Sequence, residues 1–187
     1  LEKKIITKIV KPTLSALKKK GMAYTGFLYV GLMIKNNEPF LIEYNVRMGD
    51  PECQVIIPRL KTDIVKIFKA TIENKLNTIK IKWIKKKCMT IVVCSKGYPG
   101  KYKNNKPLKN LKKIKLNDNS FIFHAGTILK NKKLFSNGGR VFNVVSTGLN
   151  YLTIRKNIIK IIKKINWKDG FFRKDIGWRV IKNLWEL

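Results

Sequence analysis

The sequence predicts an α+β fold, in which amphipathic helices are combined with antiparallel strands. Short runs of alternating apolar and polar residues, separated by Gly, Asn and Lys, indicate strands. Isoleucines at helical spacing over residues 153–165 indicate one long amphipathic helix. The pattern changes around residue 85, which predicts one domain over residues 1–85 and a second, β-rich domain over residues 86–187.

The composition excludes several classes of protein. Of the 187 residues, 44% are apolar, which argues against a disordered polycation. Three cysteines without a Cys-x-x-Cys spacing exclude a disulfide scaffold and fit a reducing cytoplasm, and a single histidine excludes a structural zinc site. The first residues do not resemble a signal peptide, and no apolar run approaches the ~20 residues of a membrane span. We therefore expect a cytoplasmic protein and no membrane partner.

The net charge of +30 raises the alternative of a nucleic-acid-binding protein. Base composition offers another explanation, because Lys (35), Ile (25) and Asn (17) are the residues that A- and T-rich codons favour, whereas Arg contributes only 6. The lysines run through nearly every segment and do not follow one stripe. We interpret the charge mainly as compositional drift, so nucleic acid is not the expected partner.

The N-terminal segment predicts a helix and then a β-hairpin. Apolar residues at helical spacing cover residues 2–20, with a kink expected at Pro12 and a C-terminal cap at Gly21. Two strands and the turn between them are expected at residues 24–34, 39–47 and 35–38.

Helix signals and strand patterns follow along the rest of the chain. Asp50-Pro51-Glu52 combines an N-cap residue, a first-turn proline and an acid, which predicts a short helix that Pro58 ends. A second helix is expected from Thr62-Asp63, and Gly138-Gly139 is interpreted as a hairpin turn. The remaining expected elements are strands at residues 88–94, 120–129 and 140–146 and the helix at residues 153–165.

The scarce acidic residues indicate where chemistry takes place. Residues i, i+2 and i+4 share one face of a strand, so Glu43, Asn45 and Arg47 are expected to project together. Carboxylate and amide oxygens suit a hard cation such as Mg²⁺, and the arginine fork suits phosphate oxygens. The alternative is an ordinary exposed polar edge of a half-buried strand.

The run EYNVRMGDPE at residues 43–52 resembles the metal- and phosphate-binding segment of ATP-grasp ligases, and more narrowly that of the glycinamide ribonucleotide synthetases (phosphoribosylamine–glycine ligases). The chief departure is Met48, where that family usually has Phe. Further matches follow the family's order: YTGFLY at 24–29, GYPG at 97–100, HAGT at 124–127, NGGRV at 137–141 and RKDIG at 173–177. The resemblance covers essentially the whole chain.

This resemblance implies the C-terminal portion of an ATP-grasp domain followed by a small β-rich closing domain. It implies ATP-dependent ligation of glycine to 5-phosphoribosylamine through a glycyl phosphate, giving glycinamide ribonucleotide, ADP and phosphate in purine synthesis. The family's proteins are more than twice this length, and the chain begins with Leu in mid-pattern. We therefore expect a fragment whose missing N-terminal part belongs to the same ligase, and which is inactive alone.

The resemblance also implies roles for single residues. Glu43 and Asn45 would bind Mg²⁺ or Mn²⁺ that bridges the ATP phosphates, and Arg47 would be the catalytic, ATP-contacting residue that stabilises charge on the transferring phosphoryl group. The substrate-contacting residues implied are Gly49, Asp50, His124, Arg140 and Lys174.

Each of these roles has a structural alternative. Asp50 can cap the helix that Pro51 begins, His124 can be a structural histidine, and Lys174 can lie in a docked tail whose charges pair with one another. At the level of the whole protein, the alternatives are a different ATP-grasp carboxylate–amine ligase, a basic nucleic-acid-binding protein and an inactive remnant of the ligase.

Overall fold

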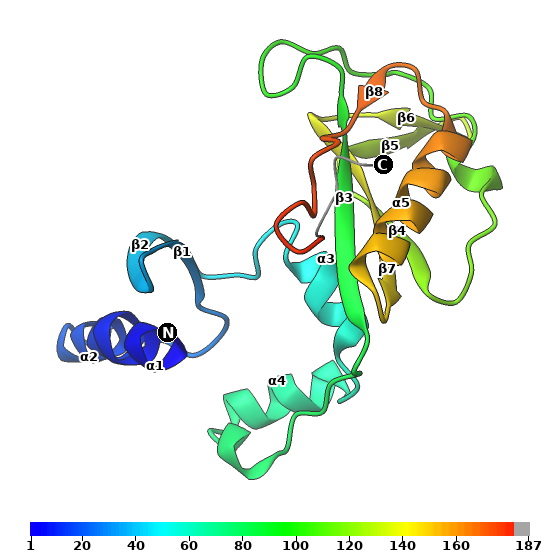
Figure 1. Ribbon diagram of the computed structural model, residues 1–187. Helices are drawn as coiled ribbons and strands as arrows, with labels where there is room; N and C mark the ends of the chain where they lie inside the picture. The colour runs from blue at the N-terminus through cyan, green and yellow to red at the C-terminus, as the bar shows by residue number, and fades with distance from the viewer. Residues whose placement is uncertain (182–187) are drawn as a thin grey trace. The chain divides into compact units, whose positions relative to one another are not determined.

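The computed structural model describes residues 1–181 (Figure 1). The chain divides into two compact units, Leu1–Asp50 with Thr62–Lys82 and Pro51–Lys61 with Trp83–Leu187. The chain passes from the first unit to the second for the last time between Lys82 and Trp83, near the domain boundary that the sequence predicts at residue 85. The predicted domains and the observed units differ over Pro51–Lys61, which belongs to the second unit although it precedes residue 85.

The first unit begins with one helix that contains a wide turn. α1 (Glu2–Ile5), the π-helical segment η1 (Ile6–Val10) and α2 (Lys11–Lys19) follow one another without a break. The π turn lies directly before Pro12, whose ring cannot fit the regular α-helical spacing. Gly21 adopts φ +71° after the last turn, and the N–H of Met22 donates to the carbonyl of Leu17 at 2.9 Å. The predicted helix and its glycine cap are therefore confirmed, and a π-helical segment precedes Pro12, where a kink was predicted.

The predicted hairpin is formed by β1 (Tyr29–Lys35) and β2 (Glu38–Asn45). Asn36 and Asn37 both have positive φ (51° and 60°), as a two-residue turn of this kind requires. The strands are shorter than predicted, because β1 begins at residue 29, not 24, and β2 ends at residue 45, not 47.

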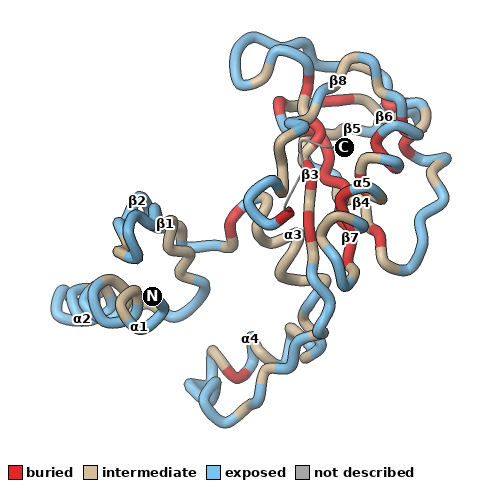
Figure 2. The backbone as a smooth tube through the Cα atoms, in the orientation of Figure 1, coloured by how far each residue is buried: buried red, intermediate tan, exposed pale blue. Residues whose placement is uncertain are grey.

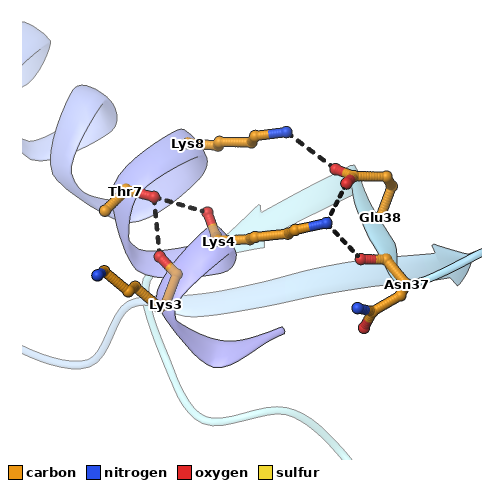
Figure 3. A network of polar contacts seen from close by, with 6 residues as sticks. All are labelled: Lys3, Lys4, Thr7, Lys8, Asn37 and Glu38. Carbon is orange, nitrogen blue, oxygen red and sulfur yellow. Dashed lines mark hydrogen bonds and ion pairs between the residues drawn. The ribbon is translucent and has the colours of Figure 1, made fainter.

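An ion-pair network joins the N-terminal helix to the hairpin (Figure 3). Glu38, the first residue of β2, accepts from the ammonium groups of Lys4 and Lys8, the latter at 2.9 Å. Lys4 also donates to the carbonyl of Asn37 at 3.3 Å. The hydrogen bonds from both lysines lower the pKa of Glu38 from 4.5 to about 2.

The first unit also contains α4 (Ile64–Ile72) and the short η3 (Leu76–Thr78). The predicted start of α4 near Thr62-Asp63 is confirmed: Asp63 is the N-cap, and its carboxylate accepts from the N–H of Val65 at 2.8 Å. The ring of Phe68 meets that of Phe27 edge to face, with centroids 5.8 Å apart. Most apolar side chains of this unit remain exposed.

The second unit opens with α3 (Cys53–Ile56) and η2 (Ile57–Arg59). Its start differs from the prediction, since Glu52 and not Asp50 is the N-cap residue. Asp50-Pro51-Glu52 instead form a turn before the helix. The predicted N-cap position at Asp50 was therefore wrong, because the chain becomes helical only from Glu52, whose φ of −66° and ψ of −38° are helical.

A four-stranded antiparallel sheet forms the centre of the second unit, in the order β4-β7-β3-β8. Its strands are β3 (Lys87–Ser95), β4 (Ser120–His124), β7 (Arg140–Gly148) and β8 (Gly170–Phe171), and η4 (Leu111–Lys113) precedes β4. A separate hairpin consists of β5 (Thr127–Lys130) and β6 (Lys133–Ser136).

Two strand predictions need correction. Residues 120–129 form two strands in different sheets, because the chain turns at Ala125-Gly126. Gly138-Gly139 is not a hairpin turn, because the strands on either side, β6 and β7, do not pair with each other. β6 and β8 were not predicted.

Helix α5 (Tyr151–Ile165) packs against β3 and β7. Asn150 caps it by accepting from the N–H groups of Leu152 and Thr153, and Asn166 ends it with φ 46°. The predicted isoleucine stripe is buried, as its members Ile154, Ile158, Ile161, Ile162 and Ile165 all show. Figure 2 shows that buried residues concentrate on the sheet and α5, where the core of this unit lies.

Candidate functional site

The predicted metal-binding residues Glu43 and Asn45 lie together at the end of β2. The Asn45 side-chain amide donates to Glu43 Oε1 at 3.0 Å, so the shared strand face is confirmed. Gly31 is the β1 residue paired with Glu43, and a Cβ there would lie 2.9 Å from Glu43 Cγ. The glycine therefore leaves room for the Glu43 side chain to lie across the hairpin.

Arg47, Gly49 and Asp50 follow β2 in an irregular segment of the first unit. Arg47 was predicted to share a strand face with Glu43. The strand ends at Asn45, however, so Arg47 lies outside β2. Its guanidinium donates to the carbonyl of Met48 at 2.8 Å. Gly49 is buried, whereas Arg47 and Asp50 are exposed.

The donor set of Glu43 and Asn45 fits a hard cation that keeps other ligands. One carboxylate and one amide supply oxygen ligands, and Mg²⁺ commonly takes only one or two protein carboxylates besides water and phosphate oxygens. Within residues 1–181, no group of three or more His, Cys, Asp and Glu side chains could hold a metal ion. The pair therefore suits a cation that also contacts phosphate, and does not suit a closed structural site.

In the second unit, three of the quoted motifs meet at one end of the sheet. His124 ends β4, and its Nδ1 lies 3.0 Å from Thr127 Oγ1. The N–H of Gly126 donates to the carbonyl of Arg140 at 2.9 Å, and the N–H of Asn137 donates to the carbonyl of Gly126 at 2.7 Å. The HAGT and NGGRV segments are therefore joined through their backbones, and the exposed His124 and Arg140 belong to one cluster.

Glycines allow this close approach. A Cβ at Gly126 would lie 2.7 Å from the carbonyl oxygen of Arg140 and 2.9 Å from the Cα of Gly138. A Cβ at Gly139 would lie 2.1 Å from the ring of Tyr98. A side chain at Gly126 would push the HAGT and NGGRV segments apart, and one at Gly139 would strike Tyr98.

Tyr98 and Ser95 belong to this cluster, although no role was predicted for either. Ser95 Oγ donates to the carbonyl of Gly138 at 2.8 Å, and its N–H donates to the carbonyl of Gly139 at 2.7 Å. The Tyr98 ring covers Gly139. The GYPG motif pointed to Tyr98 in the sequence. That this motif contacts the NGGRV segment is known only from the fold.

Lys174 follows β8, the short strand that pairs with β3 on the side opposite β7. The guanidinium of Arg155, a buried residue, donates to the carbonyls of Lys174 and Ile176, the latter at 3.1 Å, and so fixes this segment. The neighbouring Arg173 and Asp175 pair with each other, as the docked-tail alternative predicts. Lys174 lines an apolar hollow of about 320 Å³ beside Trp167.

No helix in the described part of the chain combines the length and the apolar character that crossing a membrane requires.

Family comparisons match both parts of the chain. Residues 1–53 match the phosphoribosylglycinamide synthetase ATP-grasp (A) domain, and residues 88–179 match the phosphoribosylglycinamide synthetase C domain. The two domains occur here in one chain, in the order expected from the motifs.

Curated relatives extend the match. The phosphoribosylamine–glycine ligase of Caldanaerobacter subterraneus is 44% identical over 170 residues, which are 91% of this chain and 40% of the relative. The chloroplastic phosphoribosylamine–glycine ligase of Arabidopsis thaliana is 38% identical over 182 residues, 95% of this chain and 34% of the relative. The trifunctional purine biosynthetic protein adenosine-3 of Gallus gallus is 40% identical over 95% of this chain and 18% of its own length.

The crystal structure of phosphoribosylamine–glycine ligase from Thermotoga maritima is similar to this structure, with a TM-score of 0.70 and 31% identity. The similarity covers 91% of this chain and 41% of that ligase. The chain thus spans about two fifths of the ligases of Caldanaerobacter and Thermotoga. Both family matches, the relatives and the solved structure agree, and the chain belongs to the phosphoribosylglycinamide synthetase family.

Proposed function

We propose that the protein containing this chain joins glycine to 5-phosphoribosylamine at the expense of ATP, through a glycyl phosphate, and releases glycinamide ribonucleotide, ADP and phosphate. The observation that carries the proposal is that two successive domains of one ligase family match this one chain. The ligase names of the relatives support it, and the paired oxygen ligands of Glu43 and Asn45 suit the chemistry.

ATP and Mg²⁺ or Mn²⁺ are the cofactors of this proposal. Glu43 and Asn45 would hold the cation, whose charge would assist phosphoryl transfer when it is bound between the ATP phosphates. The hydrogen bond between the two side chains orients Asn45 so that its amide oxygen is not used by Glu43. The pair is therefore a prepared set of oxygen ligands on a paired strand.

Arg47 would stabilise the charge on the transferring phosphoryl group. Arg47 lies outside the strand, and its guanidinium donates to the carbonyl of Met48. The side chain is exposed, so a change of rotamer would let the guanidinium contact a phosphate. Gly49 and Asp50 would shape the floor near the small substrates. Gly49 suits such a role because it is buried in an irregular segment, where a side chain would fill space.

The glycine and 5-phosphoribosylamine substrates would involve the second unit through His124 and Arg140. The hydrogen bonds that join the HAGT and NGGRV segments support a shared role for these two residues. Lys174 would contact substrate from another place in the unit, where Arg155 holds its backbone. A cytoplasmic location is part of the same proposal, although the Arabidopsis relative is named as chloroplastic.

The family matches favour the ligase over a nucleic-acid-binding protein, because neither matched domain is named for nucleic acid. An inactive remnant is the alternative that activity measurements decide. The match covers only 40% of the Caldanaerobacter ligase, and the partner of this chain in the proposal is the N-terminal part of the same ligase.

The test is a chimera in which the Caldanaerobacter ligase supplies the part that this chain does not match. We expect the chimera to form glycinamide ribonucleotide from glycine, 5-phosphoribosylamine and ATP with added Mg²⁺ or Mn²⁺, and the 187-residue chain alone to form none. Glu43→Gln in the chimera should lower metal-dependent kcat/KM by about 100-fold or more. Glu73→Gln, which changes an acid paired only with surface lysines in the same unit, is the matched control.

Turnover by the 187-residue chain alone would contradict the expectation that the chain is inactive by itself, but not the proposed reaction. A folded chimera without ligase activity would contradict the proposal and favour the inactive remnant. The control is the intact Caldanaerobacter ligase, which must be active under the same conditions.

A further inference from the structure

The segment from Lys96 to Lys106 forms a positively charged hollow that the proposed site does not use. The hollow encloses about 390 Å³, which is within the range of small-molecule sites. Its lining residues are Lys96, Lys101, Tyr102, Lys103, Lys106 and Asp169. One carboxylate thus faces four ammonium groups.

The charge of the hollow is only partly compensated. Asp169 pairs with Lys106 at 3.5 Å. Within residues 1–181, Lys96, Lys101 and Lys103 have no ion pair with a carboxylate. Like charges gathered in a concave surface repel one another and raise the local potential, so an anion entering the hollow would relieve the repulsion.

The backbone, and not chance placement of flexible side chains, brings these lysines together. Gly97 has φ +101°, and a Cβ there would lie 2.2 Å from the carbonyl oxygen of Lys101. The chain therefore folds back on itself at Gly97, which places Lys101 beside Lys96. The N–H of Lys96 donates to the carbonyl of Asp169 at 2.8 Å, which fixes one side of the hollow.

The other end of the segment is fixed as firmly. The N–H of Lys106 donates to Ser136 Oγ at 3.1 Å, and its carbonyl accepts from the N–H of Ser136 at 2.8 Å. Ser136 is fully buried, so these bonds hold the segment to the body of the unit. The hollow is thus a structured part of the fold.

Tyrosine supplies an uncharged wall. Tyr102 lines the hollow and meets Tyr98 edge to face, with ring centroids 6.1 Å apart. Tyr98 in turn covers Gly139, which precedes Arg140 in the cluster described above. An aromatic wall beside ammonium groups suits a ligand that combines a phosphate with a less polar body such as a sugar ring.

We propose that this hollow binds the phosphate group of a small phosphorylated molecule. Lys96, Lys101 and Lys103 donate to the phosphate oxygens, and Tyr102 contacts whatever the phosphate is attached to. The proposal does not rest on the ligase reaction, because binding needs neither ATP nor the metal. The phosphate could come from inorganic phosphate or from a sugar phosphate, and the experiment separates these sources.

The test titrates the 187-residue chain, at 150 mM salt, with inorganic phosphate, ribose 5-phosphate, ribose and a single-stranded oligonucleotide, by calorimetry and by NMR of the backbone amides. We expect both phosphates to bind and to shift the amides of residues 96–106, and ribose to do neither. Tighter binding of ribose 5-phosphate would identify a sugar phosphate as the source, and equal binding would identify inorganic phosphate.

The variant Lys101→Met/Lys103→Met should weaken phosphate binding about tenfold or more, because two charge-assisted hydrogen bonds are lost. The control is Lys156→Met/Lys160→Met, which removes the same charge from another lysine-lined hollow, on the surface of α5, that contains no aromatic residue. It should leave binding unchanged.

Three outcomes would overturn the proposal. Equal losses in both double variants would show attraction to overall charge alone. Absence of binding by either phosphate would leave the hollow without this ligand. Binding of a single-stranded oligonucleotide but of neither phosphate would show a nucleic-acid surface instead. Each readout is obtained without ligase activity, so failure here is distinguishable from failure of the proposed reaction.

Discussion

The first unit exposes many of its large apolar side chains, whereas the second unit buries its own. In the hairpin, Ile42 is 63% exposed and Phe40 54%. In the second unit, Phe142, Val144 and Ile158 are fully buried between the sheet and α5. Both regions have the apolar residues of a globular protein, but only the second has two layers that bury them against each other.

This difference shows that an apolar pattern in the sequence determines only which face of a helix or strand is apolar. A hydrophobic core forms only where another element packs against that face. The first unit has many exposed large apolar side chains, and exposed apolar surface is typical of regions that other segments cover. The chain spans only about 40% of its Caldanaerobacter relative, which agrees with such a surface. The four predictions below test the comparison, from the largest expected effect to the smallest.

Truncating one isoleucine in each unit tests the comparison directly. Ile158→Ala should lower the free energy of unfolding by about 3 kcal/mol, since it leaves a cavity beneath α5. Ile42→Ala should change it by less than about 0.5 kcal/mol, because Ile42 is already exposed. Urea unfolding monitored by circular dichroism measures both, and equal effects would contradict the comparison.

The loss of stability when a glycine is replaced by alanine shows whether the atoms around that glycine can move. Gly139→Ala should cost about 1–3 kcal/mol, because its Cβ would strike the Tyr98 ring in a packed cluster. Gly31→Ala should cost less, because the Glu43 side chain that it meets can move. Thermal unfolding compares the two, and a larger cost at Gly31 would show that the hairpin is the more rigid site.

The ion pairs of Glu38 predict a pH dependence confined to the first unit. The pKa is lowered from 4.5 to about 2, so the stabilisation is present above pH ~4.5 and is lost as the pH falls toward 2. NMR titration of the Glu38 carboxyl should show this low midpoint. Lys4→Met should raise the midpoint, and a wild-type midpoint near 4.5 would exclude the network in solution.

Thiol reactivity should report the burial within β3. Burial raises the pKa of Cys88 to about 11 and also raises that of Cys94, so both are protonated and slow to alkylate at pH 8. In a Cys53→Ser background, iodoacetamide should react with them more slowly than with a small free thiol. Rates equal to that thiol would show that the edge of the sheet opens readily.

The sequence by itself determined those elements whose local signals and tertiary surroundings agree. The isoleucine spacing specified α5, Asn36-Asn37 specified the hairpin turn, and Asp63 specified the start of α4. The motifs also identified the family and the adjacency of Glu43 and Asn45, because strand neighbours two residues apart share a face by geometry alone. These features depend on residues close together along the chain.

Only the tertiary structure decided the features that depend on distant segments. It placed Tyr98 over Gly139, joined Gly126 to Arg140, and fixed the backbone of Lys174 through Arg155. Asp50 shows the same limit, because an N-cap signal predicts a helix start only if the following residues turn helical at once. Hydrogen bonds between residues tens of positions apart leave no periodic trace in the sequence, so their partners are known only once the chain has folded.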